Sequence, residues 1–299
     1  MPILHAIVLG VVQGLAEFIP ISSSGHLIFV PWLFGWDDFA GNDSLQKTFD
    51  VALHIGTLAG AIAYFRRDLV ALGLAALRPG RQGVRVPATP DEPAGPEGDR
   101  PGEMVSTAEV ERRLAWLLLL SAVPAAITGA LLSDVIEENT GQIWLIAVML
   151  IAFGGVLLWA DRLAGARPTE DLRWRDALAM GVGQALALQP GISRSGVTIT
   201  VGRRIGFSRD AAARLSFLMS LPIIGGAILY KGLDVMSEGG IPPEMTGAFV
   251  AGIIASGITG WFAVWGTLRL IRTRTFAPFV LYRVVVGAAL LVLVAAGFR

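Results

Sequence analysis

A short polar run interrupts an apolar stretch near the start of the chain. Residues 13–26 read QGLAEFIPISSSGH and contain one glutamate, three consecutive serines and one histidine. A charged side chain in apolar surroundings is costly unless it is paired or hydrogen-bonded, and one that is kept there usually serves a site. We therefore take Glu17 and His26 as candidate functional residues.

A second copy of this run lies in the other half of the chain. Residues 10–25 and 181–196 align without gaps and are identical at nine of sixteen positions. The second copy, which continues into the sequence PGISRSGVT, places Arg194 opposite Ser23. A repeat of this kind indicates two copies of one structural unit.

The side chains of these two runs suit a phosphate ligand. Arg194 offers a planar fork that binds phosphate oxygens bidentately. Hydroxyls donate hydrogen bonds, helices that begin after the serines would point backbone N–H groups at an anion, and glycine lets the backbone approach closely. Besides Arg194, the predicted phosphate-binding residues are Ser22, Ser24, Gly25, Ser193, Ser195 and Thr198.

Other side chains of the first run could provide chemistry at a bound phosphate. Glu17 offers the oxygen ligands that hard divalent cations prefer, and Gln13 lies one helical turn earlier on the same face, so both are candidate metal ligands. His26 is suited to proton transfer near neutral pH. A serine beside such a base can be a nucleophile, and Ser22, Ser23, His26 or an activated water all remain open for that role.

The composition places these residues in a membrane protein. Hydrophobic residues make up 54% of the 299-residue chain and charged residues only 16%, whereas soluble domains carry about 25% charged residues. Apolar runs of about 20 residues recur, which is typical of a polytopic helical membrane protein. The net charge of zero gives no basic surface for nucleic acid, and the absence of cysteine excludes disulfides and thiolate metal sites.

The apolar runs predict six membrane-spanning helices and two interrupted segments. The six spans are expected at roughly 51–66, 114–133, 143–160, 211–230, 246–267 and 277–297. Two more apolar stretches, 2–34 and 176–202, are interrupted by proline, glycine and serine. Broken helices at membrane depth are tolerated where they line a cavity or are buried in protein, so the two breaks should meet inside the molecule.

Basic residues predict how these segments are oriented. Nineteen of the 24 lysines and arginines lie in four places, 66–113, 162–175, 203–214 and 269–274. The positive-inside rule assigns all four to the cytoplasm. One interrupted stretch then enters the membrane and returns on the cytoplasmic side, and the other does so from outside. We therefore expect two re-entrant helix hairpins in an inverted-topology repeat.

The whole chain, 1–299, is expected to form one integral membrane domain. One repeat would cover about 1–133 and the other about 143–299. Segment 78–103 is rich in proline and glycine and is predicted to be a flexible cytoplasmic loop. A homodimer is compatible with the sequence, which does not determine the oligomeric state.

Other polar side chains within the apolar segments are weaker signals. His54 and Asp50 are expected to support the site indirectly or to lie at the membrane interface. Arg283 is expected to extend to the membrane surface or to pair with a carboxylate.

The motifs resemble those of a known family. QGLAE (13–17) matches the [E/Q]xxxE motif of the bacterial undecaprenyl-diphosphate phosphatases, also called the bacitracin-resistance family, and PGISRSGVT (190–198) matches their PGxSRSxxT motif. SSSGH (22–26) is similar to their serine-rich stretch that ends in histidine. The resemblance covers essentially the whole chain and implies six spanning helices, plus two re-entrant helix pairs, in an inverted repeat.

The resemblance also implies an activity and residue roles. It implies that the terminal phosphate is removed from undecaprenyl diphosphate, which recycles the lipid carrier for cell-wall synthesis, with Mg²⁺ or Ca²⁺ as cofactor. The protein would lie in the bacterial inner membrane with its site facing the periplasm. By motif, Glu17 would be a metal ligand or acid–base group, and Ser23 the candidate nucleophile with His26 as its base or proton shuttle. Arg194 would stabilise the transition state. Gln13, where many members carry glutamate, adds no charge.

Two other classes of function are compatible with parts of this pattern. A transporter or flippase would also use inverted repeats with broken helices, and would bind a lipid headgroup without hydrolysing it. A structural scaffold would leave Glu17, His26 and Arg194 unexplained. Release of phosphate from an isoprenyl diphosphate distinguishes a phosphatase from both.

Overall fold

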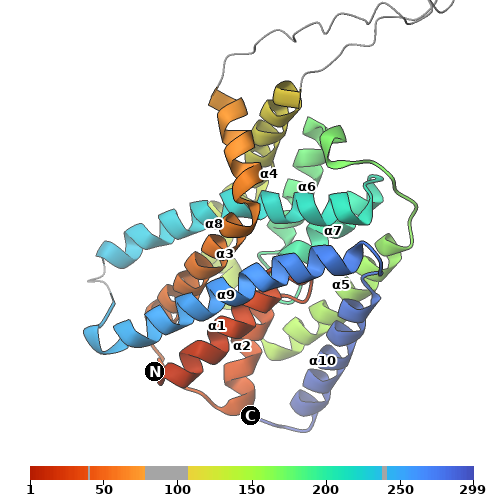
Figure 1. Cartoon of the computed structure of the whole chain (residues 1–299). Coiled ribbons are helices and arrows are strands. Elements are labelled where there is room, and N and C mark those ends of the chain that lie inside the picture. Colours follow the sequence, from red (N-terminus) through yellow and green to blue (C-terminus); the bar gives the residue numbers. More distant parts are fainter. Residues whose placement is uncertain (40, 78–106, 238–240) are drawn as a thin grey trace, which may run out of the picture.

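The computed structural model describes residues 1–39, 41–77, 107–237 and 241–299, and the described chain is helical (Figure 1). Segment 78–103, predicted to be a flexible loop, lies outside the described residues. The α-helices are α1 (Ile3–Phe18), α2 (Ser23–Phe34), α3 (Asp43–Leu77), α4 (Thr107–Thr140), α5 (Ile143–Asp161), α6 (Trp174–Leu186), α7 (Arg194–Arg204), α8 (Arg209–Ser237), α9 (Thr246–Ile271) and α10 (Ala277–Ala295). Two short 3₁₀-helices, η1 (Thr169–Asp171) and η2 (Pro243–Met245), complete the described elements.

Six of these helices are long and apolar enough to cross a membrane. They are α3, α4, α5, α8, α9 and α10, and their most apolar windows have mean hydropathies between 1.3 and 2.5. Large apolar side chains such as Leu131, Leu229 and Leu281 are exposed on them, as expected of surfaces that face lipid. The six spans predicted from the sequence are confirmed, and the chain is a multi-pass membrane protein.

The two interrupted apolar stretches each form a pair of short helices. The first break, residues 19–22, contains Pro20 and separates α1 from α2, and the second, residues 187–193, contains Pro190 and separates α6 from α7. Proline lacks the N–H that would continue a helix. Ser22 and Ser193 cap α2 and α7 with φ angles of 76° and 75°. Positive φ is uncommon for residues other than glycine, so the two copies of the sequence motif share an unusual backbone conformation.

Small residues bring α1 and α3 against α9, which crosses both helices in Figure 1. A Cβ atom built on Gly14 of α1 would lie 2.5 Å from the carbonyl oxygen of Ser256, and one built on Gly56 of α3 would lie 2.1 Å from the hydroxyl of the same serine. The missing side chains therefore allow close backbone contact, as in many membrane helix pairs. As a result α9 fixes the positions of α1 and α3 relative to each other.

Arg283 of α10 holds the two helix breaks together. Its side chain is completely buried, and its guanidinium donates to five backbone carbonyls, those of Pro20, Met149, Leu150, Gly191 and Ile192. The prediction that Arg283 reaches the membrane surface or pairs with a carboxylate is wrong, because the described residues give it carbonyl partners only. The broken helices leave carbonyls without helical partners, and one planar fork satisfies them.

Replacement of Arg283 should therefore unfold the region around both breaks. We expect Arg283→Met to lower the free energy of unfolding by about 3 kcal/mol or more, because several buried carbonyls lose their donors at once. Arg204→Met, which changes an exposed arginine at the end of α7, is the matched control and should have little effect. Thermal unfolding in detergent measures the stability of both variants, and equal stabilities would contradict this role of Arg283.

Candidate active site

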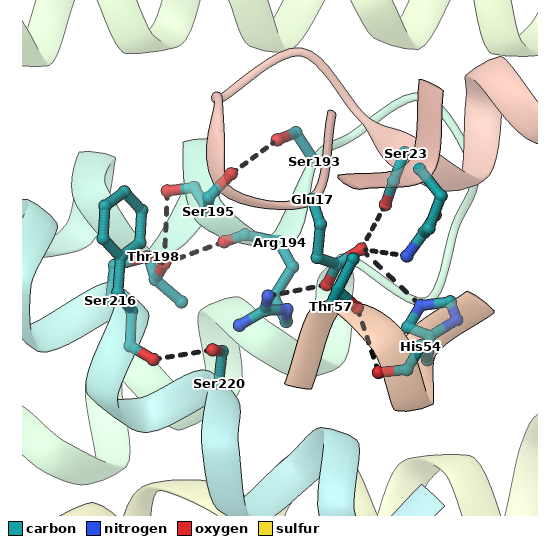
Figure 2. Close-up of polar contacts among 12 residues, drawn as sticks. Glu17, Ser23, His54, Thr57, Ser193, Arg194, Ser195, Thr198, Ser216 and Ser220 are labelled. Atoms are coloured by element: carbon teal, nitrogen blue, oxygen red, sulfur yellow. Dashed lines mark hydrogen bonds and ion pairs between the residues drawn. The ribbon is translucent and has the colours of Figure 1, made fainter. Parts of the chain in front are cut away.

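The carboxylate of Glu17 is the centre of a polar cluster whose members come from α1, α2, α3 and α7 (Figure 2). Its Oε1 accepts a hydrogen bond of 2.7 Å from Nη2 of Arg194, on α7. Its Oε2 accepts one of 2.6 Å from the hydroxyl of Ser23, on α2, and one of 3.0 Å from Nε2 of Gln13, on α1. Nε2 of His54, on α3, lies 3.5 Å from the same oxygen. The buried charge is therefore compensated by an ion pair and by hydrogen-bond donors, as a buried carboxylate requires.

The two helix breaks contact each other directly beside this cluster. The backbone N–H of Gly191 in the second break donates to the hydroxyl of Ser22 in the first, at 3.0 Å. The hydroxyl of Ser195 donates in return to the carbonyl of Ile19, at 3.4 Å. Residues some 170 positions apart in the sequence therefore form one continuous surface.

A pocket of about 240 Å³ opens at this surface. Its polar lining residues are Glu17, Ser23, Ser24, His54, Ser193 and Arg194. Its apolar lining residues are Ala16, Val51, Ala187, Leu188, Ile223, Ile224, Ala227 and Ile228. The lining residues from α8 are all apolar, whereas the polar ones come from the other segments. Such a pocket suits an amphiphilic ligand, because each part of the ligand can contact groups of its own polarity.

Two polar atoms of the cluster have no hydrogen-bond partner among the described residues. They are Nη1 of Arg194 and Oε1 of Gln13, and both are buried. An arginine carries five N–H donors, and the bond from Nη2 to Glu17 leaves the Nη1 donors for a ligand. A buried donor that remains unsatisfied costs free energy. Arg194 is therefore prepared to bind an anion at the pocket.

The cluster fits a metal ion that is held by the protein together with a bound phosphate. Within the described ranges, no group of three or more histidines, aspartates or glutamates could hold a metal, so these described side chains alone form no cage for an ion. Mg²⁺, however, is commonly held by one or two carboxylates together with substrate phosphates. Glu17 lines the pocket and fits a cation that shares its coordination with a bound phosphate. Gln13 is buried and does not line the pocket, so its part in holding a cation stays a prediction.

His26 is buried near the cluster but does not line the pocket. Its Nδ1 lies 2.7 Å from the carbonyl oxygen of Ser22, and its Nε2 lies 2.7 Å from the hydroxyl of Tyr282. Both ring nitrogens are therefore engaged, and neither contacts Ser23. In this geometry His26 supports the turn at Ser22, and its predicted role as a base stays a prediction.

The other predicted phosphate-binding residues divide into two groups. Ser24 and Ser193 line the pocket. The remaining four, which do not line it, stabilise the breaks and the helix behind them: Ser22, Gly25, Ser195 and Thr198. The hydroxyl of Thr198, for example, lies 2.6 Å from that of Ser216 on α8.

His54 belongs to the cluster, whereas the sequence predicted that it would support the site indirectly or lie at the membrane interface. It lies in an ordinary spanning helix, outside both copies of the repeated motif. Its only sequence signal is that it is an ionisable residue within an apolar span, which by itself marks a candidate functional residue. Its contact with Glu17 depends on how α3 packs against α9.

Comparisons with known proteins agree with one another. The family model described as "Bacitracin resistance protein BacA" matches residues 6–289. Proteins named "Undecaprenyl-diphosphatase" are similar over nearly their whole length. That of Pelotomaculum thermopropionicum is 41% identical and covers 99% of this chain and 98% of its own. That of Geobacter sulfurreducens is 42% identical and covers 97% of this chain and 98% of its own. That of a Nocardioides species is 38% identical and covers 98% of this chain and 97% of its own.

Binding of a small diphosphate tests whether Arg194 is an anion site. Methylenediphosphonate should bind the wild-type protein, and Arg194→Lys should weaken binding about tenfold or more, because a single ammonium cannot contact both Glu17 and the anion as the guanidinium fork can. Arg204→Lys, on the same helix but exposed, should bind normally. Isothermal titration calorimetry in detergent measures the affinities, and equal affinities of the two lysine variants would contradict the assignment.

Proposed function

Because this chain belongs to the bacitracin resistance protein BacA family, we propose that it is an undecaprenyl-diphosphatase. It hydrolyses undecaprenyl diphosphate to undecaprenyl phosphate and inorganic phosphate, and so returns the lipid carrier to cell-wall synthesis. The proposal is supported by similarity over nearly the full length of relatives that carry this name. It also agrees with the chemistry of the pocket.

One observation carries the mechanism, namely the 2.6 Å hydrogen bond from the Ser23 hydroxyl to Glu17. A nucleophile within hydrogen-bond reach of a base is the arrangement that covalent catalysis needs. Arg194 holds the other carboxylate oxygen, so that the oxygen near Ser23 stays directed toward the hydroxyl. Glu17 is therefore assigned as the base, one of the two roles that the motif implies for it, in place of His26.

The reaction proceeds in two displacements. Oγ of Ser23 attacks the terminal phosphorus and passes its proton to Glu17, while the anhydride P–O bond breaks and undecaprenyl phosphate leaves with the bridging oxygen. Water then attacks the phosphorus of the phosphoserine, and Oγ regains its proton from Glu17 as inorganic phosphate departs. Arg194 contacts the phosphoryl oxygens during both steps and offsets their charge.

A divalent cation, Mg²⁺ or Ca²⁺, is proposed as the cofactor. When bound, it would neutralise charge on the diphosphate beside the Glu17 carboxylate. Glu17 and Gln13 are the residues that would hold it, supported by the oxygen of Gln13 that is otherwise unpartnered. With glutamine in place of a second carboxylate, the protein contributes a single negative charge to that ion.

The apolar wall of the pocket is proposed to receive the isoprenoid chain next to the diphosphate. Ile223, Ile224, Ala227 and Ile228 project from α8, a helix that is long and apolar enough to span the membrane. The membrane places the lipid substrate beside this wall, so the headgroup needs to move only a short way to reach Arg194.

The two helix pairs are proposed to be re-entrant hairpins of an inverted-topology repeat. The matching caps at Ser22 and Ser193 support this, as do the four basic segments, which the positive-inside rule assigns to the cytoplasm. The repeats would cover about 1–133 and 143–299 of one domain. The first hairpin would enter from outside, so the site would face the periplasm of the bacterial inner membrane.

Phosphate release from farnesyl diphosphate, a detergent-soluble isoprenyl diphosphate, tests the proposed function. The purified protein should release phosphate, EDTA should abolish the release, and Ser23→Ala and Glu17→Gln should each lower kcat by about 10²-fold or more. Glu170→Gln, in the exposed η1 helix, should retain wild-type turnover. A wild-type protein that moves the lipid across vesicles without releasing phosphate would be a flippase, and the proposed function would be wrong.

A further inference from the structure

His54 is a polar residue of the pocket that the proposed reaction does not use. Its side chain is about one-third exposed, with 32% relative accessibility, and it lines the pocket beside Glu17. The distance from its Nε2 to Oε2 of Glu17 is 3.5 Å. That oxygen is the one that accepts the hydroxyl of Ser23. His54 therefore acts on the carboxylate oxygen that faces the nucleophile.

The orientation of the His54 ring is fixed from its other side. Its Nδ1 lies 2.7 Å from the backbone carbonyl oxygen of Asp50, and a carbonyl can only accept a hydrogen bond. Nδ1 consequently carries the donated hydrogen, and Nε2 is the atom directed toward Glu17. A carboxylate also only accepts, and Nδ1 already carries a hydrogen. The 3.5 Å contact is therefore attractive when Nε2 carries a hydrogen as well, that is, when His54 is an imidazolium cation paired with Glu17.

The backbone around His54 is held at a fixed spacing from α1. The hydroxyl of Ser256, on α9, donates at 2.8 Å to the carbonyl of Leu53, the residue before His54. The same serine packs against Gly14 of α1, one turn before Glu17. One residue of α9 therefore contacts both helices and sets the distance between the imidazole and the carboxylate.

We propose that His54 is a positioning residue that keeps Oε2 of Glu17 directed at the Ser23 hydroxyl. The inference rests on the proposed function. Arg194 holds Oε1 of the carboxylate, whereas Oε2 is fixed by the groups that contact it directly, Gln13 at 3.0 Å and His54 at 3.5 Å. Ser23, Glu17 and His54 then form a chain of nucleophile, base and orienting group, the general arrangement of an activated nucleophile.

Three substitutions separate this role from a structural one. Glutamine can place an amide N–H near the position of Nε2, whereas asparagine can place one only near Nδ1, and leucine has neither donor. We expect His54→Leu and His54→Asn to lower kcat about 10²-fold with KM within about threefold of wild type. His54→Gln should stay within about tenfold of the wild-type kcat. A residue whose only role is its bond to the Asp50 carbonyl within α3 would show the opposite order, with asparagine the better substitute.

The test measures farnesyl diphosphate turnover and methylenediphosphonate binding for the wild type and the three His54 variants. Thermal unfolding of the same proteins shows whether each variant is folded. Anion affinity should be within about threefold of wild type in all three variants. Normal kcat in His54→Leu, equal activities of the asparagine and glutamine variants, or a loss confined to KM would overturn the proposal. If the leucine variant fails to fold, the asparagine and glutamine pair decides. An inactive wild-type protein would instead refute the proposed function, and this inference with it.

Discussion

A single buried carboxylate determines how the rest of the molecule is arranged. Glu17 lies inside a membrane protein, where an uncompensated charge would be costly. Its partners come from α1, α2, α3 and α7, so the charge is tolerated only when two distant helix breaks and a spanning helix meet. The contacts that compensate the buried charge of Glu17 therefore stabilise the fold, and they also bring together a nucleophile, a base and an anion site.

The same arrangement depends on a second buried group, which carries the opposite charge. Breaking a helix exposes carbonyls that lipid cannot satisfy. Arg283 satisfies carbonyls at both breaks and in α5, and the serine caps satisfy backbone N–H groups of the helices that follow. Glu17 thus joins the breaks through their side chains and Arg283 joins them through their backbone. Either alone would leave the strained turns at Ser22 and Ser193 free to relax.

The spans and the helix breaks could be predicted from the sequence, because hydropathy and proline act locally. The internal repeat also pointed to Glu17, Ser23 and Arg194, which the structure brings to one pocket. His54 could not be placed in the same way, because its contact arises from the packing of α3 and α1 on α9. Arg283 was misjudged for a similar reason, since its carbonyl partners come from three segments that are far apart in the sequence.

The most direct test of this account is to trap the phosphorylated enzyme. The enzyme is mixed with a lipid diphosphate labelled in its terminal phosphate and quenched rapidly in acid and, in parallel, in alkaline detergent, where phosphohistidine survives. Peptide mapping of both samples identifies the residue that carries the phosphoryl group. The account predicts an acid-stable phosphoserine at Ser23 that forms about 10²-fold more slowly in Glu17→Gln. Label on a histidine, or phosphate release at the wild-type rate from Ser23→Ala, would contradict it.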